Sequence, residues 1–119
     1  MPFLLLYFKE ITMKKESEFQ SGLIKDIEKR LPGCFIEKAD PNYRQGTPDL
    51  RVYYKDRWAA LEVKRSAKEV HQPNQDFYVE QLNKMSFARF IYPENKEEVL
   101  DEMERALSSK RSPRNNRSK

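Results

Sequence analysis

The order of secondary-structure patterns between Glu16 and Leu107 constrains the fold of this chain more than any other feature. A helical pattern comes first, three strand patterns follow, and a helix, a strand and a last helix complete the order αβββαβα. Strands and helices that alternate in this way predict a mixed sheet flanked by helices. We therefore expect an α/β fold.

Three segments have the spacing of amphipathic helices. Over residues 16–31 apolar residues recur every four positions, and Pro32 and Gly33 end the pattern. A helix of about eleven residues is expected after Asn74, and another after Asn95, which can cap it. The apolar members of these helices are Phe19, Leu23, Ile27, Leu31, Phe77, Val79, Leu82, Met85, Val99, Leu100, Met103, Ala106 and Leu107.

Four short segments have the alternation and composition of strands. They are residues 34–39, 49–54, 58–64 and 87–92. The tight polar turn at 55–57 predicts that the second and third strands form a hairpin. The loop before this hairpin is rich in turn residues.

Composition limits the chemistry that the chain can carry. One Cys and one His exclude an internal disulfide and a zinc site of the usual nitrogen and sulfur ligands. We expect a protein of the reducing cytoplasm, in which a metal site would have carboxylate ligands.

The net charge of +4 is unevenly distributed. Residues 110–119 contain five Lys or Arg and no acid, so residues 1–109 hold 18 basic and 19 acidic groups. The domain is thus nearly neutral, and a nucleic-acid partner would need a local basic surface and the tail.

The two ends of the chain are expected to lie outside the domain. Residues 1–12 form an N-terminal extension, either upstream of a true start at Met13 or a short edge strand or hydrophobic arm. Its apolar run is too short to cross a bilayer, so no membrane partner is expected. Residues 108–119 are predicted to be a basic disordered tail, which leaves 13–107 as the domain.

Charged side chains share one face of the third strand. Glu62 and Lys64 project to one side, whereas Leu61 and Val63 project to the other. The hairpin brings Asp49 beside Glu62, and two converging carboxylates repel each other unless a divalent cation such as Mg²⁺ or Mn²⁺ neutralises them. Phosphodiester hydrolysis uses such a metal together with a lysine.

The run Gly46-Thr47-Pro48-Asp49, followed by Glu62-Val63-Lys64, resembles the signature of the PD-(D/E)XK nuclease superfamily. Glu18 in the first helix is similar to the upstream acid of archaeal Holliday-junction resolvases. Gln75 resembles the Gln of the post-motif helix in VRR-NUC nucleases. The resemblance covers residues 16–92, and the short chain is similar to small phage-encoded members.

The resemblance implies a restriction-endonuclease-like αβββαβ core, here with an extra C-terminal helix. It also implies a Mg²⁺- or Mn²⁺-dependent DNA endonuclease that hydrolyses phosphodiester bonds with a metal-activated water. The similarity to resolvases makes branched DNA the more specific expectation for its substrate. Within such a site Asp49, Glu62 and the Val63 carbonyl would bind the metal, and Glu18 would support it or a second ion. Lys64 would activate or position the water, and Gln75 would orient the nucleophile or a phosphate.

Each of these residues also has a simpler interpretation. Asp49 could be a turn residue, and Glu62 and Lys64 could be the wet face of an edge strand. Glu18 could be only a favourable acid in a first helical turn, where Glu16 competes for its role. Gln75 could be a polar residue at a helix start. His71 lies in a polar loop and is interpreted as a solvated residue or a phosphate contact outside the active site.

Tyr43 and Arg44, in the loop before the hairpin, are the first candidates for DNA contacts, together with Arg65 and Lys68. No base-reading motif is present, so sequence specificity is not predicted. Because the domain is small, we expect a homodimer or a targeting protein partner. Two alternatives are a non-catalytic nucleic-acid-binding accessory module with this fold, and an interaction protein that uses its N-terminal arm and the acidic surface of residues 97–101.

Overall fold

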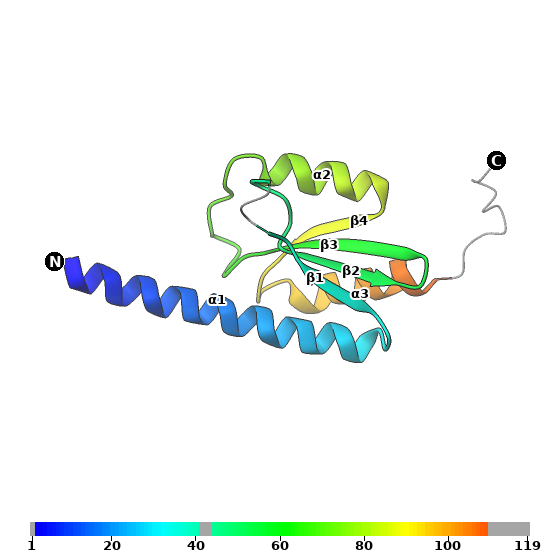
Figure 1. Cartoon of the computed structure of the whole chain (residues 1–119), viewed down its shortest axis with the longest axis horizontal. Coiled ribbons are helices and arrows are strands. Elements are labelled where there is room, and N and C mark those ends of the chain that lie inside the picture. The colour runs from blue at the N-terminus through cyan, green and yellow to red at the C-terminus, as the bar shows by residue number, and fades with distance from the viewer. Residues whose placement is uncertain (1, 41–43, 110–119) are drawn as a thin grey trace.

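The computed structural model of the chain describes residues 2–40 and 44–109 (Figure 1). The described elements follow the expected order αβββαβα. They are α1 Pro2–Arg30, β1 Phe35–Lys38, β2 Leu50–Tyr54, β3 Arg57–Val63, α2 Gln75–Met85, β4 Phe87–Ile91 and α3 Lys96–Ser108. The strands and the last two helices form close to their expected bounds, whereas the first helix begins well before residue 16.

The four strands form one mixed sheet in the order β1-β2-β3-β4. β1, β2 and β3 are antiparallel neighbours, whereas β4 runs parallel to β3 because α2 carries the chain across the sheet. The hairpin register pairs Leu50 with Leu61, and a tight turn with Lys55 at φ 59° connects β2 to β3. The predicted α/β fold with a mixed sheet and flanking helices is confirmed.

Helices α1 and α3 cover one face of the sheet, and α2 lies over the other (Figure 1). The main core lies on the first face, where the apolar stripes of α1 and α3 pack against Leu61 and Val63 of β3. Its helical members are Leu23, Ile27, Leu31, Val99, Leu100, Met103 and Leu107, all buried. This face supplies most of the apolar burial of the domain.

The core under α2 is much smaller. Its buried members are Ala60, Val79 and Ala88. Phe77 and Met85, two apolar members of this helix, are exposed by 56% and 70%. Phe77 lies two positions, or about 200°, from Val79 around the helix, and Met85 is the last helical residue.

Helix α1 is longer than the sequence pattern predicts, because it begins at Pro2 and continues through the expected extension. The alternative that residues 1–12 form an edge strand is therefore wrong. Where translation starts stays a prediction. Among the described residues, no helix combines the length and apolar character needed to span a membrane.

Ion pairs join α1 to α3. Arg30 near the end of α1 contacts Glu97 at 2.9 Å, Asp101 at 2.7 Å and Glu104 at 3.1 Å. Acidic residues of α3 are thus paired within the molecule, which weakens the interpretation of this helix as an acidic docking surface.

Asn95 precedes α3 but does not cap it, because its side chain binds the backbone at the end of β4. Of the predicted tail 108–119, Ser108 instead ends α3, and residues 110–119 lie outside the described residues.

Candidate active site

Glu62 and Lys64 lie at the end of β3 and are buried. Only 3% of Glu62 and 2% of Lys64 is exposed. Alternation along the strand sends Leu61 and Val63 into the main core and turns Glu62 toward α2, as predicted. The interpretation of these two charged residues as a wet strand face is therefore wrong. Burying a carboxylate and an ammonium is costly unless both are given partners.

Asp49 lies beside Glu62, because Leu50 pairs with Leu61 and the preceding residue falls opposite Glu62. The Val63 backbone N–H donates a hydrogen bond of 2.9 Å to Asp49 Oδ2. The carboxyl groups of Asp49 and Glu62 are close enough to share a hydrogen bond when one of them is protonated. The position of Asp49 at the strand entry thus brings two acids together.

Gln75, the first residue of α2, connects Glu62 to Lys64. Its Nε2 donates to Glu62 Oε2 at 3.0 Å, and its Oε1 accepts from Lys64 Nζ at 2.6 Å. The Gln72 backbone N–H donates to the same Oε1 at 2.8 Å. Lys64 Nζ also donates to the Val70 carbonyl at 3.2 Å. The side-chain amide of Gln75 therefore holds Glu62 and Lys64 in fixed positions.

The electrostatic environment of the two acids opposes their ionisation. Burial, with the charge of Asp49 as the next cause, raises the pKa of Glu62 to about 9. Burial also raises the pKa of Asp49, although the Val63 N–H and Glu62 partly offset the effect. At neutral pH the pair therefore binds a proton unless a positive charge replaces it.

Glu16 is the acid of α1 that lies near this pair. Burial, then the charges of Glu69 and Asp49, raises its pKa. Glu18, the residue that the resemblance favours, is exposed, and no described hydrogen bond or ion pair joins it to the site. At about 100° per residue, Glu18 points about 200° away from Glu16. The structure thus brings Glu16, and not Glu18, toward Asp49.

Sequence reasoning missed Glu69, whose charge raises the pKa of both Asp49 and Glu62. Its carboxylate accepts a hydrogen bond of 2.6 Å from the Arg65 N–H and pairs with the Arg65 side chain at 3.5 Å. The available signal in the sequence was the spacing of four residues between Arg65 and Glu69, but both residues lie in a loop that has no periodic pattern. Arg65 thus lies at the edge of the site, and Lys68 is exposed in the same loop.

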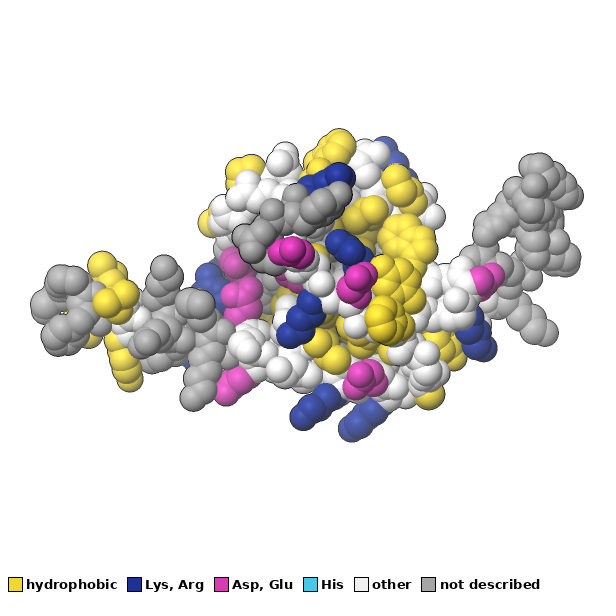
Figure 2. Space-filling view, viewed as in Figure 1, with side chains coloured by type: hydrophobic (Ala, Val, Ile, Leu, Met, Phe, Trp, Pro, Cys, Tyr) yellow, Lys and Arg dark blue, Asp and Glu magenta, His cyan; other side chains and the backbone are white. Residues whose placement is uncertain are grey.

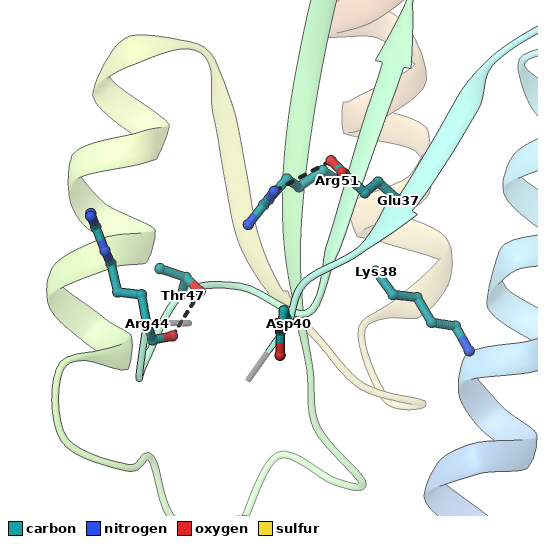
Figure 3. A pocket seen from close by; sticks show the side chains of 6 residues that line it. All are labelled: Glu37, Lys38, Asp40, Arg44, Thr47 and Arg51. Carbon is teal, nitrogen blue, oxygen red and sulfur yellow. Dashed lines mark hydrogen bonds and ion pairs between the residues drawn. The ribbon is translucent and has the colours of Figure 1, made fainter. Parts of the chain in front are cut away.

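A cavity of about 260 Å³, here called the Asp49 cavity, opens onto Asp49 and Gln75. Gln20 of α1, Lys38 of β1 and Arg44 of the following loop also line it. A neighbouring cavity of about 380 Å³ shares Lys38 and Arg44 and extends toward Glu37 and Arg51, which point toward each other in Figure 3. Arg44 is thus beside the site, whereas Tyr43 lies outside the described residues.

Gly46 lets the loop before Asp49 pack directly against the start of α2. Its φ is 92°, and a Cβ there would lie 2.8 Å from the Asn74 Cβ and 3.1 Å from the Pro73 carbonyl oxygen. Asn74 is itself left-handed, with φ 74°. This contact places the Asp49 loop and Gln75 at a fixed separation.

His71 lies outside the cluster. Its Nδ1 is 2.7 Å from Asp76 Oδ1, and its ring stacks on Phe90 with centroids 4.0 Å apart. The side chain is thus held between two neighbours. No described contact joins it to Asp49, Glu62 or Lys64, in agreement with its expected place outside the active site.

The acids fit a divalent cation. Glu62 Oε1 is buried and has no hydrogen-bond donor, and a positive charge would relieve the repulsion between Glu62 and Asp49. Among the described residues, no three His, Cys, Asp or Glu side chains gather closely enough to hold a metal ion. Such a cation would therefore take water, carbonyl or substrate oxygens as its other ligands, as Mg²⁺ commonly does.

Comparison with solved structures places this fold beside a known domain. The chain is similar to a structure described as "VRR_NUC domain", with a TM-score of 0.60 and 21% sequence identity over 73% of this chain and 95% of that one. No protein-family model matches the chain, and no curated protein matches it. The chain therefore has the restriction-endonuclease-like fold of a VRR_NUC domain.

Proposed function

We propose that the chain is a divalent-metal-dependent DNA endonuclease. The observation that carries this proposal is the contact of the half-buried Asp49 and Gln75 with the buried Glu62 and Lys64 on a VRR_NUC fold. Two acids with raised pKa values and a lysine beside them suit phosphodiester hydrolysis better than they suit structural stability.

Asp49 and Glu62 would hold a Mg²⁺ or Mn²⁺ ion together with the Val63 carbonyl. Glu16, rather than Glu18, is the acid of α1 that we propose beside this pair, and it would act on the ion through a bound water rather than as a third carboxylate ligand. When bound, the ion would neutralise charge on the phosphate and lower the pKa of a water molecule.

Lys64 acts beside these acids. Its Nζ donates hydrogen bonds to two described acceptors, the Val70 carbonyl and Gln75 Oε1, which fix the position of the ammonium group. The third N–H of this group would orient a water or a phosphate oxygen. Gln75 keeps Lys64 and Glu62 at their positions, and Arg44 and Arg65 bind phosphates at the cavity rim. The resemblance to junction resolvases extends the proposal to branched DNA and to a homodimer or a targeting partner.

The test is cleavage of end-labelled single-stranded, duplex, flapped and four-way-junction DNA with Mg²⁺, Mn²⁺ or EDTA. We expect metal-dependent cleavage that falls by at least about 100-fold in Lys64→Ala and in the isosteric Asp49→Asn. Lys84→Ala, an exposed lysine of α2, is the matched control and keeps its activity.

Thermal unfolding of each variant separates loss of chemistry from loss of the fold. If folded wild-type protein binds these DNAs but cuts none of them with either metal, the endonuclease proposal is wrong. That outcome would favour the non-catalytic accessory module.

A further inference from the structure

A second cavity of about 260 Å³ lies between strands β2 and β3 and helix α2, and we call it the aromatic cavity. Tyr53, Trp58 and Tyr78 contribute three aromatic rings to its wall, and Arg44 and Arg51 contribute two guanidinium groups. Tyr53 and Trp58 are paired across the hairpin, so their side chains are neighbours on one face of the sheet. Tyr78 reaches this space from α2.

This cavity is a neighbour of the Asp49 cavity. Arg44 and Thr47 line both, so the same short loop separates the aromatic rings from Asp49. Figure 2 shows hydrophobic side chains gathered over this side of the molecule, with Lys or Arg side chains beside them. An extended ligand could therefore reach from one cavity to the other past a single loop.

The apolar core does not account for these rings. Among the described residues, the apolar cluster under α2 has Ala60, Val79 and Ala88 as its buried members, and Trp58 is partly buried against them. Tyr53 remains 38% exposed, and its hydroxyl donates a hydrogen bond of 2.9 Å to Glu37. The rings surround a hollow in which another flat group would find apolar contact on several sides.

Two arginines, Arg44 and Arg51, are the charged residues of the cavity lining. Arg51 contacts Glu37 at 3.3 Å, but this pair is exposed on both sides and is weak enough for a phosphate to compete. Aromatic faces combined with arginines are the usual means of binding unpaired nucleotides, because a base stacks while its phosphate is neutralised. The cavity is smaller than the pockets that hold drug-sized ligands, which suits a single base.

We propose that the aromatic cavity binds one unpaired nucleobase of a DNA strand whose adjacent phosphate lies at the Asp49 cavity. The inference rests on the proposed function and names its substrate class: DNA with an unpaired nucleotide next to the cleaved bond. A base within a duplex is paired and stacked, so it cannot enter the cavity without leaving the helix.

Trp58 makes the test direct, because it is the only tryptophan in the chain. Its fluorescence is followed while the full-length protein in EDTA is titrated with short thymidine oligonucleotides. Matched probes are a strand of the same length with abasic sites and a blunt duplex. We expect quenching by the thymidine strand, and little quenching by the abasic strand and the duplex at concentrations where anisotropy shows them bound.

Tyr78→Ala tests the wall of the cavity. Loss of one stacking ring should weaken binding of the thymidine strand about tenfold and leave binding of the abasic strand unchanged. Met85→Ala is the matched control, since Met85 is an exposed apolar residue of the same helix that does not line the cavity. Equal quenching by the thymidine and abasic strands, or equal binding by Tyr78→Ala and wild type, would overturn the inference.

These readouts need neither metal nor cleavage, so the two proposals can fail separately. If Lys64→Ala abolishes cleavage but wild-type fluorescence does not distinguish the strands, the nuclease stands and the base site is wrong. If the strands are distinguished but no DNA is cut, the base site stands and the nuclease is wrong.

Discussion

The two faces of the sheet are built differently. The face covered by α1 and α3 buries large aliphatic side chains completely, among them Leu23 and Leu100. The face covered by α2 buries three small or medium apolar residues and, at its end, Glu62 and Lys64. One strand, β3, contributes to both faces through alternate residues.

This difference separates stability from chemistry. Packing on the α1 and α3 face offsets the cost of burying charge on the other face, where Glu62 lacks a donor for one oxygen. The α2 face can then hold polar groups that oppose folding but are available to a metal or substrate. Variants of each face should therefore affect different measurements.

The largest effect is expected from Glu62→Gln in metal-free protein. The pKa of Glu62 is about 9 in the folded protein, and its ordinary value is 4.5. The contribution of protonated Glu62 to the free energy of unfolding is therefore fully present below about pH 4.5 and is lost as the pH rises through about 9. Removing the carboxylate should raise the free energy of unfolding at pH 8, by an upper bound of roughly 5 kcal/mol. Denaturant unfolding in EDTA between pH 5 and pH 9 measures this.

Mg²⁺ provides the control for this prediction. It should raise the melting temperature of wild type at pH 8, because a cation bound to the folded state replaces the proton, and it should have little effect on Glu62→Gln. If the free energy of unfolding of the wild type in EDTA does not fall between pH 5 and pH 9, the expected raised pKa of Glu62 is wrong.

Leu100→Ala should show the contribution of the other face. Leu100 is fully buried between α3 and the sheet, so we expect the free energy of unfolding to fall by about 3 kcal/mol. Val79→Ala, the matched truncation under α2, should cost about 1 to 2 kcal/mol. Equal losses in denaturant unfolding would show that the two faces share the stability evenly.

Gln75→Ala should separate activity from stability. Without the amide, Lys64 and Glu62 lose the bridge that holds them, so we expect cleavage to slow by about 10- to 100-fold. The melting temperature should change much less than in Leu100→Ala. An unchanged cleavage rate would mean that the bridge does not position the site.

Arg30→Ala tests the smallest contribution, the ion pairs between α1 and α3. Because Arg30 and its three acidic partners are partly exposed, we expect a loss of about 1 kcal/mol that shrinks in high salt. Denaturant unfolding at low and high ionic strength measures both values. A loss that does not depend on salt would assign the effect to packing of the Arg30 side chain.

Much of the fold could be predicted because periodicity is local. The alternation in residues 58–64 predicted which side chains of β3 share a face, and the hairpin turn predicted that Asp49 meets Glu62. Side-chain contacts between distant segments could not be predicted in this way. The bridge made by Gln75 depends on the path of the loop before α2, which has no repeating pattern.

The acid of α1 illustrates the limit more precisely. The resemblance favoured Glu18, but Glu16 continues the buried stripe that contains Leu23, since seven residues complete nearly two turns. The helical stripe was therefore the better guide to the site. Glu69 had no such signal, and only the folded loop brings its charge near Asp49.

The contact at Gly46 also restricts how the chain can change over time. Because the loop before Asp49 meets the start of α2 with no room for a side chain, neither segment can be altered alone. Insertions or substitutions that reshape one of them must be matched in the other within the same lineage. Changes that leave this contact in place are thereby directed to the walls of the neighbouring cavities, where side chains that do not touch Gly46, such as Tyr78, can be exchanged one at a time.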